Sequence, residues 1–144
     1  MQPYGKVAQA AICATSFLAE HYDAKLPKRF SSSDIAKERN LSQAIIAKVL
    51  TVLSQTGIVS GAPGPGGGYT LAKSPSQISL LEVVTPFERL DTLVVCPYGD
   101  GWCGTGPQCP LHKQLLKFRS DVSEFLSKTK LDGFRSRQAT KRKA

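Results

Sequence analysis

The first regular hydrophobic pattern in the chain lies near its amino terminus, in residues 4–22. The apolar positions recur at intervals of three and four residues and are Val7, Ala10, Ala11, Ala14, Phe17, Leu18 and His21. This spacing predicts an amphipathic helix whose apolar face must be covered by another part of the chain. Cys13 lies in this helix, far from the other cysteines, and we interpret it as a small buried hydrophobic residue.

A second helical pattern begins at Ser31, in the stretch SSSDIAKERN. Ser31 can cap the helix start and Asp34, three positions later, can bond back to it, which is the capping-box arrangement. Asn40 and Leu41 then turn the chain, so this helix is expected to be short.

A third helix is predicted from Ser42, as its capping residue, to about Gln55. Its apolar side consists of Ile46, Val49, Leu50 and Leu53. Gly57 ends it, because glycine enters the left-handed region without strain. A short helix, a tight turn and a longer helix together predict a helix-turn-helix.

Two strand-like pieces follow, Ile58-Val59-Ser60 and Tyr69-Thr70-Leu71, on either side of GAPGPGGG. They predict a β-hairpin wing over residues 58–71. The glycine stretch lacks the Lys-Ser/Thr pair of a phosphate-binding P-loop, and no GxGxxG begins a helix here. A loop without side chains is able to approach a DNA backbone closely.

The last third of the chain contains two further helical patterns. Ser79 and Glu82 open a capped helix in SLLEVVTPFERL, which Pro86 is expected to kink or shorten. A long helix over residues 111–128 has apolar residues at alternating steps of four and three, namely Leu111, Leu115, Phe118, Val122 and Phe125. This is the spacing of a coiled-coil seam, and it predicts a homodimer through this helix, a contact with the chain's own first helix, or both.

The fold class expected from these patterns is mainly α with a small β-hairpin wing. The chain has 144 residues, 41% of them hydrophobic, which is enough for one compact domain, expected over residues 1–128. No apolar run approaches the roughly 20 residues of a membrane span, and no signal peptide is recognised, so we expect a cytoplasmic protein.

The net charge of +8 is concentrated at the carboxyl end. Residues 128–144 carry +6 and residues 1–127 only +2. We expect residues 129–144 to form a basic, disordered tail, or one that adds phosphate contacts. The global charge is therefore weak evidence for DNA binding.

Three of the four cysteines lie in CPYGDGWCGTGPQCPLH, residues 96–112. Cys96, Cys103, Cys109 and His112 form a set of soft donors, and cytosolic thiols stay reduced, so metal ligands are favoured over a disulfide framework. The wide spacing in a glycine-rich loop favours an iron–sulfur cluster over a structural zinc ion. We expect 2Fe–2S ahead of 4Fe–4S. A metal-free thiol switch is the remaining alternative.

With these parts placed, the chain resembles the Rrf-type winged helix-turn-helix regulators, the family of IscR, NsrR and RirA, over residues 1 to about 128. The resemblance is carried by SSSDIAKERNLS, by GPGGGY in the wing, and by three cysteines before a long helix. It implies a homodimer that binds palindromic promoter DNA and senses iron–sulfur supply, iron, nitric oxide or redox state through a cluster.

Within that family, an IscR-like branch completes its ligand set with a histidine shortly after the third cysteine, and His112 stands in that place. The NsrR-like branch uses a carboxylate early in the first helix, and GKVAQAA has none here. Two other positions depart from the family. The gap between Cys96 and Cys103 is six residues where five is usual, and Pro63 and Gly64 stand where an arginine commonly precedes the wing motif.

In a helix-turn-helix, the exposed start of the second helix meets the base edges of the major groove. The candidate DNA-binding residues are Ser42, Gln43, Ala44, Ala47, Lys48 and Thr51 in that helix and Gly66, Gly67, Gly68 and Tyr69 in the wing. Gln43 suits adenine, Lys48 suits guanine or phosphate, and Thr51 suits phosphate. The alternative for each is ordinary helix surface.

No paired carboxylates, Ser-His-Asp set or nucleotide loop is recognised, so we expect no enzyme. An iron–sulfur electron carrier is a rival class, but it leaves the helix-turn-helix and the wing unexplained. A winged-helix regulator with structural zinc or a thiol switch is another.

Overall fold

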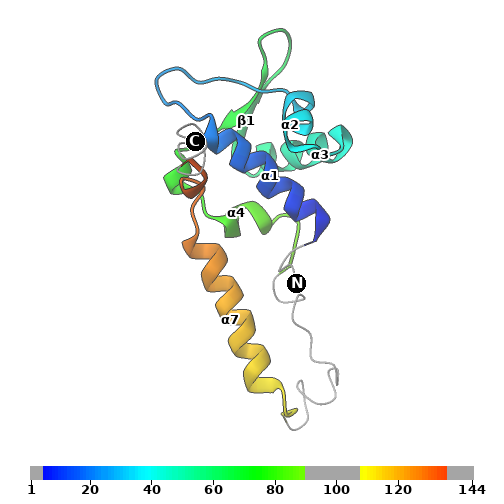
Figure 1. Cartoon of the computed structure of the whole chain (residues 1–144), viewed down its shortest axis with the longest axis vertical. Helices are drawn as coiled ribbons and strands as arrows, with labels where there is room; N and C mark the ends of the chain where they lie inside the picture. The colour runs from blue at the N-terminus through cyan, green and yellow to red at the C-terminus, as the bar shows by residue number, and fades with distance from the viewer. Residues whose placement is uncertain (1–4, 90–107, 136–144) are drawn as a thin grey trace, which may run out of the picture.

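The computed structural model of the chain describes residues 5–89 and 108–135, and its elements are shown in Figure 1. In chain order they are α1 (Lys6–Glu20), α2 (Ser32–Arg39), α3 (Gln43–Gln55), β1 (Val59–Ala62), β2 (Gly68–Leu71), the 3-10 helix η1 (Pro75–Gln77), α4 (Leu80–Val84) and α7 (His112–Lys128). The expected class, mainly α with one β-hairpin, is confirmed. Within the described residues, no helix is both long and apolar enough to cross a bilayer.

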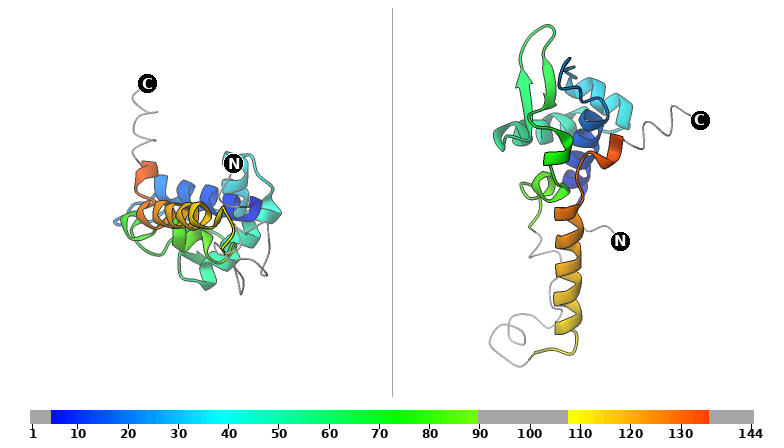
Figure 2. Two further views of the ribbon diagram at one scale, coloured as in Figure 1. Left: turned by 90° about the horizontal axis from the view of Figure 1, so that it is seen from below. Right: turned by 90° about the vertical axis from the view of Figure 1, so that its left-hand side faces the viewer.

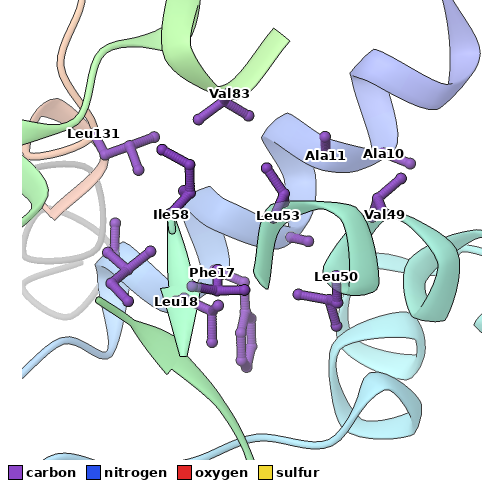
Figure 3. Packing of buried hydrophobic residues seen from close by; sticks show 14 of the residues in the cluster. Ala10, Ala11, Phe17, Leu18, Val49, Leu50, Leu53, Ile58, Val83 and Leu131 are labelled. Carbon is purple, nitrogen blue, oxygen red and sulfur yellow. The ribbon is translucent and has the colours of Figure 1, made fainter. Parts of the chain in front are cut away.

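Helix α1 lies at the centre of the core. Its buried face carries many alanines, including Ala10, Ala11 and Ala14, so α3 and α4 can both pack closely against it. Figure 3 shows Phe17 and Leu18 of α1 packed with Leu50 and Leu53 of α3 in one continuous cluster. The predicted apolar faces of both helices are confirmed, except that Val7 and His21 are only half-buried.

The first helix of the predicted helix-turn-helix is capped as expected. The Ser31 backbone N–H donates to the Asp34 carboxylate at 3.1 Å, and the Asp34 N–H donates to Ser31 Oγ at 3.0 Å. The first of these bonds holds the pKa of the Asp34 carboxyl below its usual range. Asn40 then ends α2 in the left-handed region, with φ of 53°, and this makes the tight turn.

The cap predicted for α3 is different in the structure. Ser42 does stand at the position before the helix, but its hydroxyl makes no capping hydrogen bond. Ser42 is exposed at this position. At the other end, Gly57 follows the helix with φ of +82°, as expected.

The predicted wing is an antiparallel hairpin. Its register pairs Val59 with Leu71 and Ala62 with Gly68, so the first strand extends two residues beyond Ser60 and Ile58 lies just before it. Phe30 forms a bridge to Tyr69, which attaches the segment before α2 to the outer side of β2.

Helix α4 has the predicted capping box. The Ser79 N–H donates to Glu82 Oε2 at 2.9 Å, and the Glu82 N–H donates to Ser79 Oγ at 3.2 Å. The helix ends at Val84, well before the end of SLLEVVTPFERL, because Pro86 has no N–H for the carbonyl of Glu82. The Glu88 carboxylate accepts a bond from Gly5 N at 2.6 Å, so this segment is tied to the start of α1.

The long helix α7 projects away from the rest of the described chain and returns to it only at its carboxyl end (Figures 1 and 2). Among the described residues of α7 only Leu126 is buried, and the helix packs chiefly on α4.

Residues 129–135 are packed on the domain, so the expectation of a disordered tail from residue 129 is wrong for this part. The Leu80 N–H donates to Thr129 O at 2.9 Å and the Leu131 N–H donates to Ile78 O at 3.0 Å. Leu131 is fully buried and Phe134 packs against the same cluster. Packing of Leu131 and Phe134, together with hydrogen bonds to the backbone of residues 78–80, stabilises this segment in the fold in spite of its basic charge. Residues 136–144 lie outside the described residues.

We predict that Leu131→Ala lowers the free energy of unfolding by about 2–4 kcal/mol, because it leaves a cavity beside Ile58 and Val83 in the core. Lys130→Ala is the matched control, since the Lys130 side chain is exposed. Urea unfolding followed by circular dichroism measures both. Equal stability of the two variants would show that residues 129–135 do not belong to the fold.

Candidate nucleic-acid interface and metal site

The amino-terminal half of α3 presents most of its predicted DNA-contacting residues to solvent. Ser42, Gln43, Ala44, Lys48 and Thr51 are exposed and Ala47 is half-buried. The opposite side of the same helix, with Ile46, Val49, Leu50 and Leu53, is fully buried. Packing against α1 therefore determines which residues of α3 face outwards.

Two details of α3 change the expected contacts. Thr51 Oγ1 donates to Ala47 O at 2.9 Å, so its hydroxyl hydrogen is already used within the helix and a phosphate bond would require it to rotate. Ile45 is 38% exposed next to Gln43 and Ala44, although it is apolar. Ile45 is not among the candidate residues named from the sequence, although its position outside the buried side of α3 indicates that it is exposed. Its methyl groups suit contact with a thymine methyl.

The wing glycines are required by the hairpin itself. Gly66 has φ of +74°, and a Cβ on Gly67 would lie 2.3 Å from Ala62 O. A Cβ on Gly68 would lie 2.7 Å from Phe30 O, at the bridge between Phe30 and Tyr69. These glycines therefore have a structural cause that is independent of any approach to DNA. Tyr69 pairs through its backbone, and its side chain packs against the core cluster.

Of the four predicted metal ligands, Cys109 and His112 are described, while Cys96 and Cys103 lie outside the described residues. Cys109 is 4% exposed, just before α7, and His112 is the first residue of that helix. The His112 N–H donates to Cys109 O at 3.1 Å, so the two residues are one turn apart. The described part of the chain holds no group of three or more His, Cys, Asp or Glu residues able to bind a metal ion.

The donor chemistry at this point fits a thiolate-bound metal centre. Cys109 lies at the amino-terminal end of a 17-residue helix, where the helix dipole favours a negative charge. Thiolate and imidazole are the donors that iron–sulfur clusters and zinc accept.

Cys13 differs from Cys109 in its surroundings. It is half-buried in α1 rather than fully buried as expected, and burial raises the pKa of its thiol, with the Arg39 guanidinium opposing that change. The residue is therefore a neutral thiol, which agrees with its interpretation as a hydrophobic residue.

The predicted seam of α7 lies largely in solvent. Leu111, Phe118 and Phe125 are 39%, 43% and 53% exposed, and Leu115 and Val122 are half-buried. The alternative in which α1 covers this seam is not what the structure shows, because α7 projects away from α1 (Figures 1 and 2).

A helix-turn-helix whose second helix exposes its start, with a two-stranded wing next to it, defines a winged helix-turn-helix protein. The family model described as "Iron-dependent Transcriptional regulator", Rrf2, matches residues 5–135. The chain therefore belongs to the Rrf2 family of transcriptional regulators.

Relatives and solved structures agree with this assignment. The transcriptional regulator IscR of Escherichia coli is 30% identical over 95 residues, a match that spans 66% of this chain and 58% of that protein. An HTH-type regulator of Aquifex aeolicus is 25% identical over 129 residues, which cover 88% of this chain and 86% of the relative.

The fold is also that of CymR, the global cysteine regulator of Bacillus subtilis, with a TM-score of 0.76 at 22% identity, covering 94% of this chain and 98% of CymR. The IscR of T. potens has a TM-score of 0.72 at 20% identity, covering 92% and 85%. The matching family and relatives are transcriptional regulators, which confirms the expectation that the chain is not an enzyme.

Proposed function

We propose that the chain is a cytoplasmic homodimer that binds palindromic promoter DNA, with an affinity controlled by an iron–sulfur cluster. The observation that carries the proposal is the exposed start of α3 beside a glycine wing in a chain of the Rrf2 family. The signal is iron–sulfur supply, iron, nitric oxide or redox state, each of which acts on such a cluster.

The DNA-reading residues of the proposal are at the start of α3. Gln43 pairs with adenine through its amide, and Lys48 donates to guanine or to a phosphate. Ala44 and Ala47 contact thymine methyls, while Ser42, Thr51 and wing residues Gly66, Gly67, Gly68 and Tyr69 lie along the backbone. With few hydrogen-bonding groups, the specificity depends also on DNA shape and on the spacing of two half-sites.

The homodimer of the proposal forms through α7. Its seam of Leu111, Leu115, Phe118, Val122 and Phe125 repeats at coiled-coil spacing, and three of its members are exposed in the single chain. Exposed phenylalanines at such spacing favour a second copy of the same helix as the partner.

The cluster of the proposal is held by Cys96, Cys103, Cys109 and His112. When bound, it supplies a centre whose oxidation or loss depends on iron, oxygen and nitric oxide. The chain's own part is structural. Glu88, which precedes the cysteine segment in the chain, accepts a hydrogen bond from the backbone N–H of Gly5 at the start of α1, and Cys109 lies just before α7.

With the cluster bound, these four ligands would tie residues 96–112 together and would change the angle of α7 relative to the helix-turn-helix. In a dimer, a change in that angle changes the distance between the two recognition helices. An effector of this kind acts through the difference in stability between the two arrangements.

We predict that Cys109→Ser, purified without oxygen, retains less than about a tenth of the parent's iron and sulfide and loses its visible absorption, since a thiolate ligand is removed. Cys13→Ser is the matched control and keeps the parent's content. Metal and sulfide analysis and visible absorption spectra of the parent and both variants measure these quantities. A colourless parent with stoichiometric zinc, or one without any metal, would contradict the cluster.

We predict that Gln43→Ala reduces discrimination at one base pair of each half-site by about 1–3 kcal/mol, because the bidentate amide contact is lost. Sequences selected from a random duplex pool, followed by titration of single-base variants, measure this. Gln55→Ala, an exposed glutamine at the far end of α3, is the control. If the Gln43→Ala variant keeps the base preference of the parent, Gln43 does not contact a base.

We predict that Phe118→Glu/Phe125→Glu weakens self-association by at least about a hundredfold, since each buried phenylalanine contributes about 2–3 kcal/mol. Ser120→Glu/Ser127→Glu adds the same charge on the outer side of α7 and leaves the dimer intact. Sedimentation velocity measures the oligomeric state. A parent that sediments as a monomer contradicts the proposed dimer.

A further inference from the structure

The proposed DNA-reading surface contains little positive charge of its own. Between residues 43 and 71, which include α3 and the wing, Lys48 is the sole basic residue and no acidic residue occurs. A DNA duplex carries one negative charge for about every 1.7 Å of its axis, and phosphate contacts supply much of the affinity of such proteins. Additional cations must therefore lie next to this surface.

The loop between α1 and α2 contains such cations. Residues 23–29, here called the basic loop, have the sequence DAKLPKR, with three basic residues and one acidic residue. The Asp23 carboxylate accepts bonds from Lys25 N at 2.9 Å and Leu26 N at 3.3 Å, so it is bonded to the backbone of the loop itself. Lys25 and Lys28 are exposed, and neither takes part in the ion pairs found among the described residues.

The basic loop is attached to the wing at both strands. Phe30 N donates to Tyr69 O at 3.0 Å and Tyr69 N donates to Phe30 O at 2.7 Å, which holds the end of the loop against β2. Arg29 Nη1 donates to Ser60 O of β1 at 3.3 Å. Figures 1 and 2 both show the segment between α1 and α2 running beside the base of the wing.

The geometry points to the basic loop as a phosphate-binding surface for the duplex that the wing approaches. This inference rests on the proposed DNA-binding function. Lys25 and Lys28 bind backbone phosphates next to the wing, and Arg29 is a positioning residue that fixes the loop to β1 through Ser60. The wing has no charged side chains, and it lies close to DNA because the lysines of the neighbouring basic loop attract the DNA phosphates.

Phosphate contacts and base contacts have different signatures, which makes the inference testable. Loss of a phosphate contact weakens binding to every sequence and lowers the salt dependence of the affinity, whereas loss of a base contact changes only the preference. Two lysines in each protomer make four phosphate contacts in the proposed dimer and contribute about 3.6 to the slope of log affinity against log salt.

The experiment compares Lys25→Gln/Lys28→Gln with the parent on a mixed-sequence duplex of about 30 base pairs, long enough for two half-sites. We expect the slope to fall by about 3.6 for the dimer and the affinity at about 0.1 M salt to fall at least about tenfold. The preference for selected sites over the mixed duplex is expected to stay unchanged. Lys113→Gln/Lys117→Gln, two exposed lysines of α7, removes the same charge far from the wing.

Thermal unfolding of all variants verifies that they are folded, as expected for exposed side chains. If both double variants behave alike, the basic loop makes no phosphate contact and the inference is overturned, while the proposed function stands. If the parent itself binds no duplex, the proposed function fails and this inference fails with it.

Discussion

The apolar face of α1 is buried from two directions, by α3 and by α4, and the orientation of every other element depends on this contact. Alanines at positions such as Ala10, Ala11 and Ala14 keep the distance between helices short, so both neighbours reach α1. With Ile46, Val49 and Leu53 buried in the core, Gln43 and Lys48 are left facing outwards. The exposure of the reading residues is thus a consequence of core packing.

Pairs of backbone segments far apart in sequence attach the remaining parts to this core. Phe30 pairs with Tyr69 at the wing, and residues 129–131 pair with residues 78–80 at the end of α7. Each pairing satisfies N–H and C=O groups that would otherwise face solvent or remain unbonded. As a result, the wing and α7 are fixed to the same core by these hydrogen bonds together with the buried side chains of Ile58, Val59, Leu71, Leu126 and Leu131.

Local signals predicted most of the fold. The side-chain cap expected from Ser42 is absent, and contacts between distant residues account for the other errors. The capping boxes at Ser31 and Ser79, and the glycine after α3, depend on residues within four positions of each other, and all three are confirmed. The tail was misjudged because its charge is visible in the sequence, whereas the pocket that buries Leu131 is built from distant elements. The bond from Arg29 to Ser60 could not be foreseen for the same reason. For the candidate site, periodicity alone identified the exposed side of α3, but half of the proposed ligand set lies outside the described residues.

In the proposed dimer, the position of α7 would allow a change at the cysteine segment to affect two distant recognition helices. This helix packs on the core only near Leu126 and through residues 129–131, so its amino-terminal half, which begins beside Cys109, extends away from the domain. A helix held at one end acts as a lever, and a small rotation about that attachment moves the free end by a larger distance. In the proposed dimer, the two α7 helices pack along one seam, and each is attached to its own domain at its carboxyl end. The positions of these two attachments therefore set how far apart the two domains lie. Because α3 contributes few hydrogen-bonding groups of its own, the proposed dimer would discriminate between sites largely through the spacing of its two domains, and control of that spacing would control DNA binding.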